Sequence, residues 1–158
     1  GQFKGGQMFE LGSHLVDPMV RLMGRPLKVT SILKHHGSFG DSLMDNTVAV
    51  FEWESALGVI TSATLQPGAG PHRSFEILGS NGTAVVRPIE APALQIDLAK
   101  PAGPYQLKTQ QVSLPAYRRY VDDFAELATA IRSRQPLSVS PSQELAIQDT
   151  LLRASEMV

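Results

Sequence analysis

The chain has no cysteine, one tryptophan and no long apolar run, and each of these shortages excludes a class of protein. Without cysteine it forms no disulfide or thiolate metal site, which fits a reducing compartment, so we expect a cytoplasmic protein. No apolar run approaches the roughly 20 residues of a membrane-spanning helix, so we expect no membrane partner. A net charge of -1 without a basic cluster gives no reason to expect nucleic acid as a partner.

The length and the order of the expected elements favour one α+β domain over residues 1–158. The chain can bury one substantial core and is short for two domains. Helix signals open it, β-branched segments with turn signals follow, and helix signals return in the last third. This order predicts an open, largely antiparallel mixed β-sheet with helices on one face. No strand is followed by a glycine-rich turn and a helix, so we expect no Rossmann unit here.

The first helix is predicted from glycine positions and apolar spacing. Gly5 and Gly6 precede apolar residues at three-to-four spacing, and Gly24 and Pro26 close the run. Pro18 lies inside it. Because proline lacks a backbone donor and clashes with the carbonyl four residues earlier, we expect a kink at Pro18 or a break into two short helices.

Three titratable side chains share one flank of this helix. Glu10 and His14 are four residues apart, and His14 and Asp17 are three apart. A histidine beside a carboxylate can act as a general acid or base. The alternative is a solvated surface on which Glu10 pairs with His14 and Asp17 pairs with Arg21. Spacing alone favours the surface pairs and leaves the catalytic interpretation open.

A metal site is a third interpretation of the same flank. Glu10 and His14 could both bind zinc or manganese from one helix face. A third ligand would have to come from His35, His36 or His72, and the sequence favours none of them. His35 and His36 are adjacent in an expected strand, so their side chains point to opposite faces. We therefore assign no metal ligands.

The middle of the chain predicts strands and hairpins. Residues 46–53 are apolar at both alternating sets of positions, as in a strand covered on two faces. Asn81 and Gly82 are expected to supply the positive φ angles of a tight hairpin. Strands are expected over residues 27–36, 46–53, 57–66, 74–78, 83–86, 94–99 and 106–114.

A loop over residues 67–73 ends at His72 and Arg73. Its two glycines allow close backbone approach, and the two side chains suit hydrogen bonds to a polyhydroxylated or anionic ligand. Composition alone slightly favours a plain solvated connection.

Two helices are expected in the last third. Apolar spacing predicts a helix over residues 116–133, which Pro136 ends. Ser140 as the cap residue and Pro141 in the first turn predict a final helix that runs to the C-terminus.

The order of these residues resembles a known family. Nearly the whole chain is covered by three segments in family order and a final helix pair separated by Pro136. Asp45-Asn46-Thr47 leads into a hairpin, and residues 75–82 are similar to an E-I-x-G-x-x-G turn. The main motif, Gly5-Gly6-x3-Glu10-x-Gly12-x-His14-x2-Asp17, is similar to the G-G-x3-D-x-G-x-H-x2-D signature of the glucose-fructose oxidoreductase, inositol dehydrogenase and MocA family.

The resemblance implies the C-terminal substrate-binding and oligomerisation domain of an NAD(P)-dependent oxidoreductase. Its fold would be of the dihydrodipicolinate-reductase-like or glyceraldehyde-3-phosphate-dehydrogenase-like type. Family enzymes act on a sugar, polyol or related hydroxyl or carbonyl compound. NAD or NADP would be bound mainly by an N-terminal Rossmann domain that is absent from this chain, together with a catalytic lysine in a Glu-Lys-Pro motif. The isolated chain is therefore expected to be inactive.

The resemblance also implies roles for individual residues. His14 matches the family's catalytic histidine, which accepts the proton of the hydroxyl being oxidised or donates it in reverse. Glu10, the second expected catalytic residue, matches a position usually held by Asp, and its longer side chain would keep the polar role but change the substrate geometry. Asp17 matches a second acid, which is expected to bind substrate or to support and orient the helix. The loop ending at His72 and Arg73 corresponds roughly to a segment that faces the substrate.

Two other functions stay open. The chain could be a non-catalytic dimerisation or ligand-binding module, and the apolar strand over residues 46–53 favours a homodimer or homotetramer formed through the open sheet face. It could also be a metal-assisted hydrolase or lyase that uses Glu10 and His14.

Overall fold

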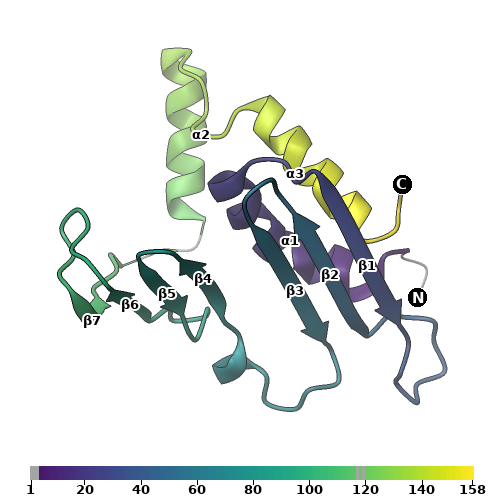
Figure 1. The fold of residues 1–158 in the computed structure, drawn as a ribbon. Helices are drawn as coiled ribbons and strands as arrows, with labels where there is room; N and C mark the ends of the chain where they lie inside the picture. Colours follow the sequence, from purple (N-terminus) through teal and green to yellow (C-terminus); the bar gives the residue numbers. More distant parts are fainter. Residues whose placement is uncertain (1–3, 117, 119) are drawn as a thin grey trace. The chain divides into compact units, whose positions relative to one another are not determined.

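The computed structural model describes residues 4–116, 118 and 120–158 (Figure 1). The chain forms two compact units. The first unit comprises Gly1–Leu65 and Asp123–Val158, and the second comprises Gln66–Asp122.

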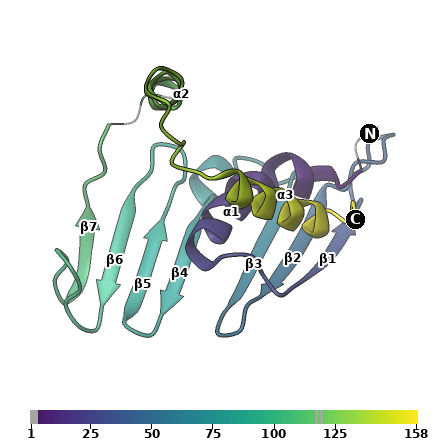
Figure 2. The same cartoon turned by 90° about the horizontal axis from the view of Figure 1, so that it is seen from above.

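The first unit is a three-stranded sheet with two helices on one face. The strands β1 (Lys28–Lys34), β2 (Asn46–Glu52) and β3 (Leu57–Ala63) pair antiparallel in that order. The helices α1 (Gly6–Met23) and α3 (Pro141–Ala154) pack against each other and lie over the same side of this sheet (Figure 2). The helix α1, on which the sequence placed the candidate catalytic residues, is therefore held by this sheet and by α3.

The core of the first unit lies between the sheet and these helices. Inward positions of β2 are buried at Thr47, Ala49 and Phe51, and outward Val48 and Val50 are partly exposed. The expectation that this strand is covered on both faces is thus not met within the chain. A fully buried Phe side chain contributes about 1.5–3 kcal/mol of transfer free energy. The helices bury Met8, Val16, Met19, Val20, Ile147, Leu151 and Ala154.

The helix α1 runs unbroken through Pro18, so of the two expected alternatives, a kink or a break into two helices, the break is wrong. Proline removes one helix hydrogen bond, but Val16, Met19 and Val20 on either side of it are buried. Packing of these side chains offsets the lost bond. At the far end, the indole Nε1 of Trp53 donates to the carbonyl oxygen of Gly24 at 2.8 Å.

The second unit is a four-stranded antiparallel sheet. The strands β4 (Phe75–Gly79), β5 (Gly82–Val86), β6 (Leu94–Leu98) and β7 (Lys108–Val112) pair in sequence order. The predicted hairpin is confirmed, with Gly79 opposite Gly82. Of the two residues expected to have positive φ, only Gly82 does, at +153°. The loop before β4 contains a short 3-10 helix, η1 (Gly70–His72).

The α+β fold class with antiparallel strands is confirmed, and the strands divide between two sheets where the sequence predicted one. The helix α2 (Val121–Ser133) begins five residues later than predicted, because Tyr120 has a φ of +68° that a helix does not accommodate. Residues 117 and 119 of the predicted helix lie outside the described residues. The helix α3 begins as predicted and ends at Ala154, short of the C-terminus.

None of the described helices is both long enough and apolar enough to cross a membrane.

Candidate functional site

The two glycines that open the signature are required by the start of α1. Gly5 and Gly6 have φ angles of +85° and +52°, in the left-handed region that favours glycine. A Cβ on Gly5 would lie 2.8 Å from the Cβ of Ser155, and one on Gly6 would lie 2.6 Å from the backbone oxygen of Met44. Any side chain at either position would displace α1 from its neighbours.

The third glycine of the signature faces the core. Gly12 is buried, and a Cβ there would lie 2.8 Å from Sδ of Met8 and 3.9 Å from Cδ1 of Leu151 in α3. The signature glycines thus fix how α1 begins and how closely it approaches α3.

Glu10 and His14 are exposed on α1. Neither side chain makes a hydrogen bond or ion pair with another residue in the described part of the chain, so the surface pair between them is not formed. Asp17 accepts a hydrogen bond from Nε of Arg21 at 2.9 Å, as the surface interpretation predicted. The structure therefore leaves Glu10 and His14 available on one flank and places Asp17 in a local ion pair.

His72 and Arg73 lie in the second unit, at the end of η1 and just after it. Arg73 forms an ion pair with Glu90. The pKa of Glu90 is lowered, first by a hydrogen bond from its own backbone N–H and then by Arg73. Arg87 Nη2 lies 3.4 Å from Nδ1 of His72. Both candidate substrate-binding side chains are exposed, and each already has a polar neighbour.

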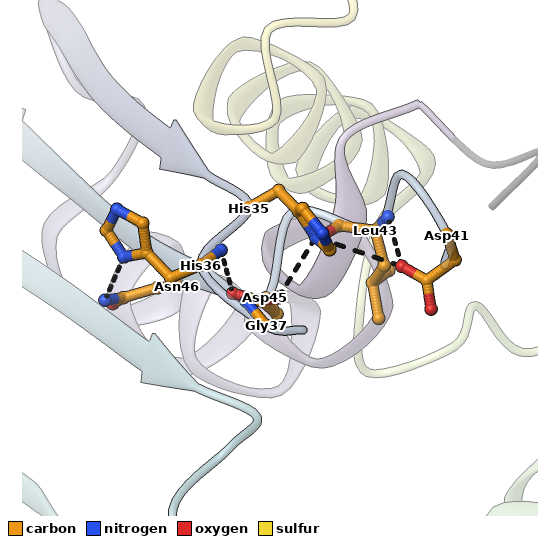
Figure 3. Close-up of polar contacts among 7 residues, drawn as sticks. All are labelled: His35, His36, Gly37, Asp41, Leu43, Asp45 and Asn46. Carbon is orange, nitrogen blue, oxygen red and sulfur yellow. Dashed lines mark hydrogen bonds and ion pairs between the residues drawn. The ribbon is translucent and has the colours of Figure 1, made fainter. Parts of the chain in front are cut away.

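A polar cluster after β1 was missed by sequence reasoning (Figure 3). The buried carboxylate of Asp45 accepts hydrogen bonds from the backbone N–H groups of His36 at 2.9 Å and Gly37 at 2.8 Å. These bonds, led by that from His36, and the nearby histidine charges lower the pKa of Asp45 despite its burial. The only local sequence signal for this cluster was the position of Asp45, directly before an expected strand and eight residues after Gly37.

The two histidines of this cluster have different partners. The ring Nδ1 of His35 lies 2.7 Å from the backbone oxygen of Leu43, whereas the ring Nδ1 of His36 lies 3.1 Å from Nδ2 of Asn46. Both residues follow β1 instead of lying inside it. Among residues 4–116, 118 and 120–158, no three His, Asp or Glu side chains are grouped so that they could hold a metal ion. The metal interpretation of Glu10 and His14 therefore gains no third ligand.

Comparisons with known proteins place this helix and sheet in a family. The family profile described as the GFO/IDH/MocA C-terminal domain matches residues 1–85, which include the whole signature and the loop with Asp45. A comparison with curated protein sequences gives no match.

Solved oxidoreductase structures share the fold at low sequence identity. A putative NADPH-dependent oxidoreductase from Desulfitobacterium hafniense is 17% identical, with a TM-score of 0.77 over 98% of this chain and 46% of that chain. UDP-N-acetylglucosamine 3-dehydrogenase GnnA from Acidithiobacillus ferrooxidans is 14% identical, with a TM-score of 0.75 over 92% of this chain and 44% of that chain.

A third solved structure is that of an oxidoreductase from Agrobacterium radiobacter in complex with NAD+, L-tartaric acid and magnesium. It is 15% identical, with a TM-score of 0.69 over 93% of this chain and 45% of that chain. This chain spans about half the length of the solved structures it matches. Because the family profile matches more than half of the 158 residues, the chain belongs to the GFO/IDH/MocA family and contains its C-terminal domain.

Proposed function

We propose that this chain is the substrate-binding part of an NAD(P)-dependent oxidoreductase that acts on a hydroxyl or carbonyl carbon of a sugar, a polyol or a related compound. His14 exchanges a proton with the substrate oxygen, and Glu10 assists it. The observation that carries the proposal is the contrast along α1. The signature glycines are packed into the fold, whereas Glu10 and His14 are exposed and make no bond within the described residues.

The chemistry of alcohol oxidation requires a group of this kind. A hydroxyl that becomes a carbonyl loses a hydride and a proton, and NAD or NADP supplies the hydride acceptor. The proton needs a base within hydrogen-bond reach of the oxygen. The ring of His14 can accept it because no described neighbour occupies either ring nitrogen, and neutral imidazole is a suitable base near pH 7. Glu10, one turn earlier, can orient the ring or bind a second hydroxyl.

Every described strand pairing is antiparallel, and no described strand is followed by a glycine-rich turn and an α-helix, the arrangement of a Rossmann unit. The proposal therefore assigns NAD or NADP mainly to a Rossmann domain outside these residues, and expects the isolated chain to be inactive. The NAD+ bound to the Agrobacterium radiobacter oxidoreductase supports a nicotinamide cofactor, and the substrate in the name of GnnA supports a sugar substrate.

The other predicted site residues take lesser roles. Asp17 was expected to bind substrate, but because its carboxylate is engaged by Arg21 we assign it to the support of α1. His72 and Arg73 are assigned to substrate binding, because their loop offers two hydrogen-bonding side chains at the surface. The ion pair with Glu90 reduces the charge that Arg73 can offer to an anion.

The test is His14→Ala in the full-length enzyme, assayed with NAD and NADP against a panel of sugars and polyols. We expect kcat/KM to fall about 10²–10⁴-fold and the pH dependence on the acidic side to disappear, since a general base is lost. The matched control is Glu54→Ala, which removes another exposed titratable side chain of the first unit, between β2 and β3, and should leave turnover unchanged. Unchanged turnover and pH profile in His14→Ala would refute the role of His14.

A specific observation also favours an oligomer. The outward face of the first sheet exposes Ile32, Leu57 and Val59 by 58%, 75% and 59%. We propose that this face joins two copies of the chain in a homodimer or homotetramer. Light scattering on Val59→Lys, beside the unchanged chain, tests this. The variant should lose the oligomer and keep its fold, because the side chain is exposed in one copy. A well-folded chain that is strictly monomeric before substitution would exclude the interface.

A further inference from the structure

The polar cluster after β1 has a partner set that the proposed function does not use. The side chain of Asp45 is only 4% exposed, and its two carboxylate oxygens accept from the N–H groups of His36 and Gly37. The backbone oxygen of Asp45 accepts from the N–H of Thr64 at 2.8 Å. One residue thus joins the end of β1, the start of β2 and the residue that follows β3.

The ring of His35 lies against this carboxylate and hydrogen-bonds the backbone of the loop. Its Nδ1 lies 2.7 Å from the backbone oxygen of Leu43, 3.2 Å from Oδ2 of Asp45 and 3.9 Å from Oδ1 of Asp41. Figure 3 shows these partners around the ring. All three neighbours are acceptors, so Nδ1 carries the proton. A buried carboxylate is costly unless donors surround it, and here both backbone donors come from the start of the loop. The loop over residues 35–44 is therefore closed upon itself by Asp45.

The end of this loop contacts the start of α1. The backbone oxygen of Met44 accepts from the N–H of Gln7 at 3.0 Å. That N–H is one of the first four in α1, which have no partner inside the helix. Gly6 lies so close that a Cβ there would be 2.6 Å from the Cβ of Met44. Met44 directly precedes Asp45, so the bonds of Asp45 fix the residue that holds the first turn of α1.

We propose that Asp45 is a positioning residue for the site on α1. By holding Met44 against Gly6 and Gln7, it sets where α1 begins and hence where Glu10 and His14 stand. The effect on turnover rests on the proposed function, whereas the placement of the helix does not. The two parts can therefore fail separately.

Amide hydrogen exchange of the full chain tests the placement. In Asp45→Asn, one oxygen becomes an NH2 group that faces backbone donors, so the loop should open and the Gln7 amide should exchange about tenfold faster relative to the Leu151 amide inside α3. The matched control is Asp41→Asn in the same loop, where the carboxylate is exposed, accepts from Leu43 N–H and lies 3.9 Å from Nδ1 of His35, farther than Asp45 does. That variant should change the exchange rate of the Gln7 amide, relative to that of the Leu151 amide, by less than about twofold. Equal acceleration at Gln7 and Leu151, or none at Gln7, would overturn the proposal.

A second variant serves if Asp45→Asn does not fold. His35→Phe removes the ring donor and keeps the two backbone bonds to Asp45. A selective acceleration at Gln7, smaller than about tenfold, supports the proposal. A change spread evenly over Gln7 and Leu151 refutes it.

Turnover of the full-length enzyme separates the inference from the proposed function. Asp45→Asn should lower kcat about tenfold or more with little change in KM, since misplacement of a base affects the chemical step more than binding. Asp41→Asn should change neither constant. Selective exchange at Gln7 with unchanged kcat would keep Asp45 as the residue that places α1 and refute the catalytic role of His14. Unchanged exchange at Gln7 would refute the positioning role, whatever the activity of the His14→Ala enzyme.

Discussion

The two sheets of this chain are built from similar alternating sequences but are buried to different degrees. In the first unit, α1 and α3 cover one face of β1–β3, and the inward Ala49, Phe51 and Ile60 are at most 2% exposed. In the second unit, Ile96 is the one buried strand residue among those described. On the same face as Ile96, Ile77 is 43% exposed.

This difference shows which part of the chain can position a site by itself. The first unit encloses its own core, so the start and direction of α1 are determined by contacts inside the unit. The second unit has an apolar face, with Phe75, Val86, Leu94 and Leu98 partly exposed, and no complete α-helix among its described residues to cover it. The stability of the second unit therefore depends more than that of the first on contacts made by residues outside its sheet.

The largest effect is expected from Phe51→Ala. Removing a fully buried ring leaves a cavity between β2 and the helices, and we expect a loss of about 3–5 kcal/mol in the free energy of unfolding. Ile96→Ala should cost about 2 kcal/mol or less, since its surroundings are more open. Urea denaturation of both variants measures the difference. A loss for Ile96→Ala that equals or exceeds that for Phe51→Ala would show that the second unit has a core as closed as the first.

A smaller loss of unfolding free energy is expected when either of two glycines with similar φ angles but different surroundings is replaced by alanine. Gly6 and Gly103 have φ angles of +52° and +55°, but a Cβ meets Met44 at 2.6 Å in one case and nothing within 4 Å in the other. Gly103→Ala should cost about 1–2 kcal/mol, the strain of the left-handed backbone alone. Gly6→Ala adds a collision with backbone and should cost about 3 kcal/mol. Equal losses, measured by thermal and urea unfolding, would mean that the contact between α1 and Met44 is not tight.

The ends of helices were predictable where glycine, proline and capping residues act on the local backbone, and helices were predictable from the spacing of apolar residues. Gly24 and Pro26 predicted the end of α1, and Ser140 with Pro141 predicted the start of α3. The sequence left a kink and a break open at Pro18, and the break does not occur because side chains on either side of Pro18 are buried by partners that local rules do not include. The division into two sheets depends on which strands pair with one another. The alternation of apolar and polar residues within a strand does not indicate which strand it pairs with.

The candidate site was predictable in part for the same reason. Helical spacing placed Glu10 and His14 on one flank, and resemblance assigned them a role that stays a prediction. The reason for Gly6 lies in Met44, which is distant in sequence and contacts it only after folding. Asp45 was seen as part of a motif, but its bonds to His36 and Gly37 depend on how the loop closes.

A pH-dependent difference between the units follows from Asp45 and Glu90. The pKa of each is lowered in the fold, Asp45 first by the His36 N–H and Glu90 first by its own N–H. An ionised Asp45 therefore stabilises the fold above its ordinary pKa of about 3.9, and this contribution is lost as the pH falls through the lower folded value. Glu90 is exposed, so solvent screens its contribution.

The measurement uses the single tryptophan. Trp53 lies in the first unit, so its fluorescence during urea denaturation reports that unit. The midpoint should fall as the pH is lowered from about 5 to about 3, and Asp45→Asn should reduce this dependence; Glu126, whose pKa in the same unit is lowered by the Ser138 N–H, accounts for part of the remainder. Glu90→Gln is the control and should leave the dependence intact. If Glu90→Gln flattened the curve and Asp45→Asn did not, the acid sensitivity would belong to the second unit.

The smallest effect is expected from the ion pair on α1. Asp17 and Arg21 are both partly solvent-exposed, with side-chain exposures of 36% and 44%. A pair of this kind at four-residue spacing contributes about 0.3–0.5 kcal/mol and is screened by salt. Asp17→Asn should therefore lower the unfolding free energy by that amount in dilute buffer and by less in 1 M salt, where the screening length is about 3 Å. In the full-length enzyme it should leave kcat unchanged, because Asp17 is already bonded to Arg21 and the proposed proton-transfer group is His14. A large loss of kcat without loss of stability would move Asp17 from the support of α1 into the site beside His14.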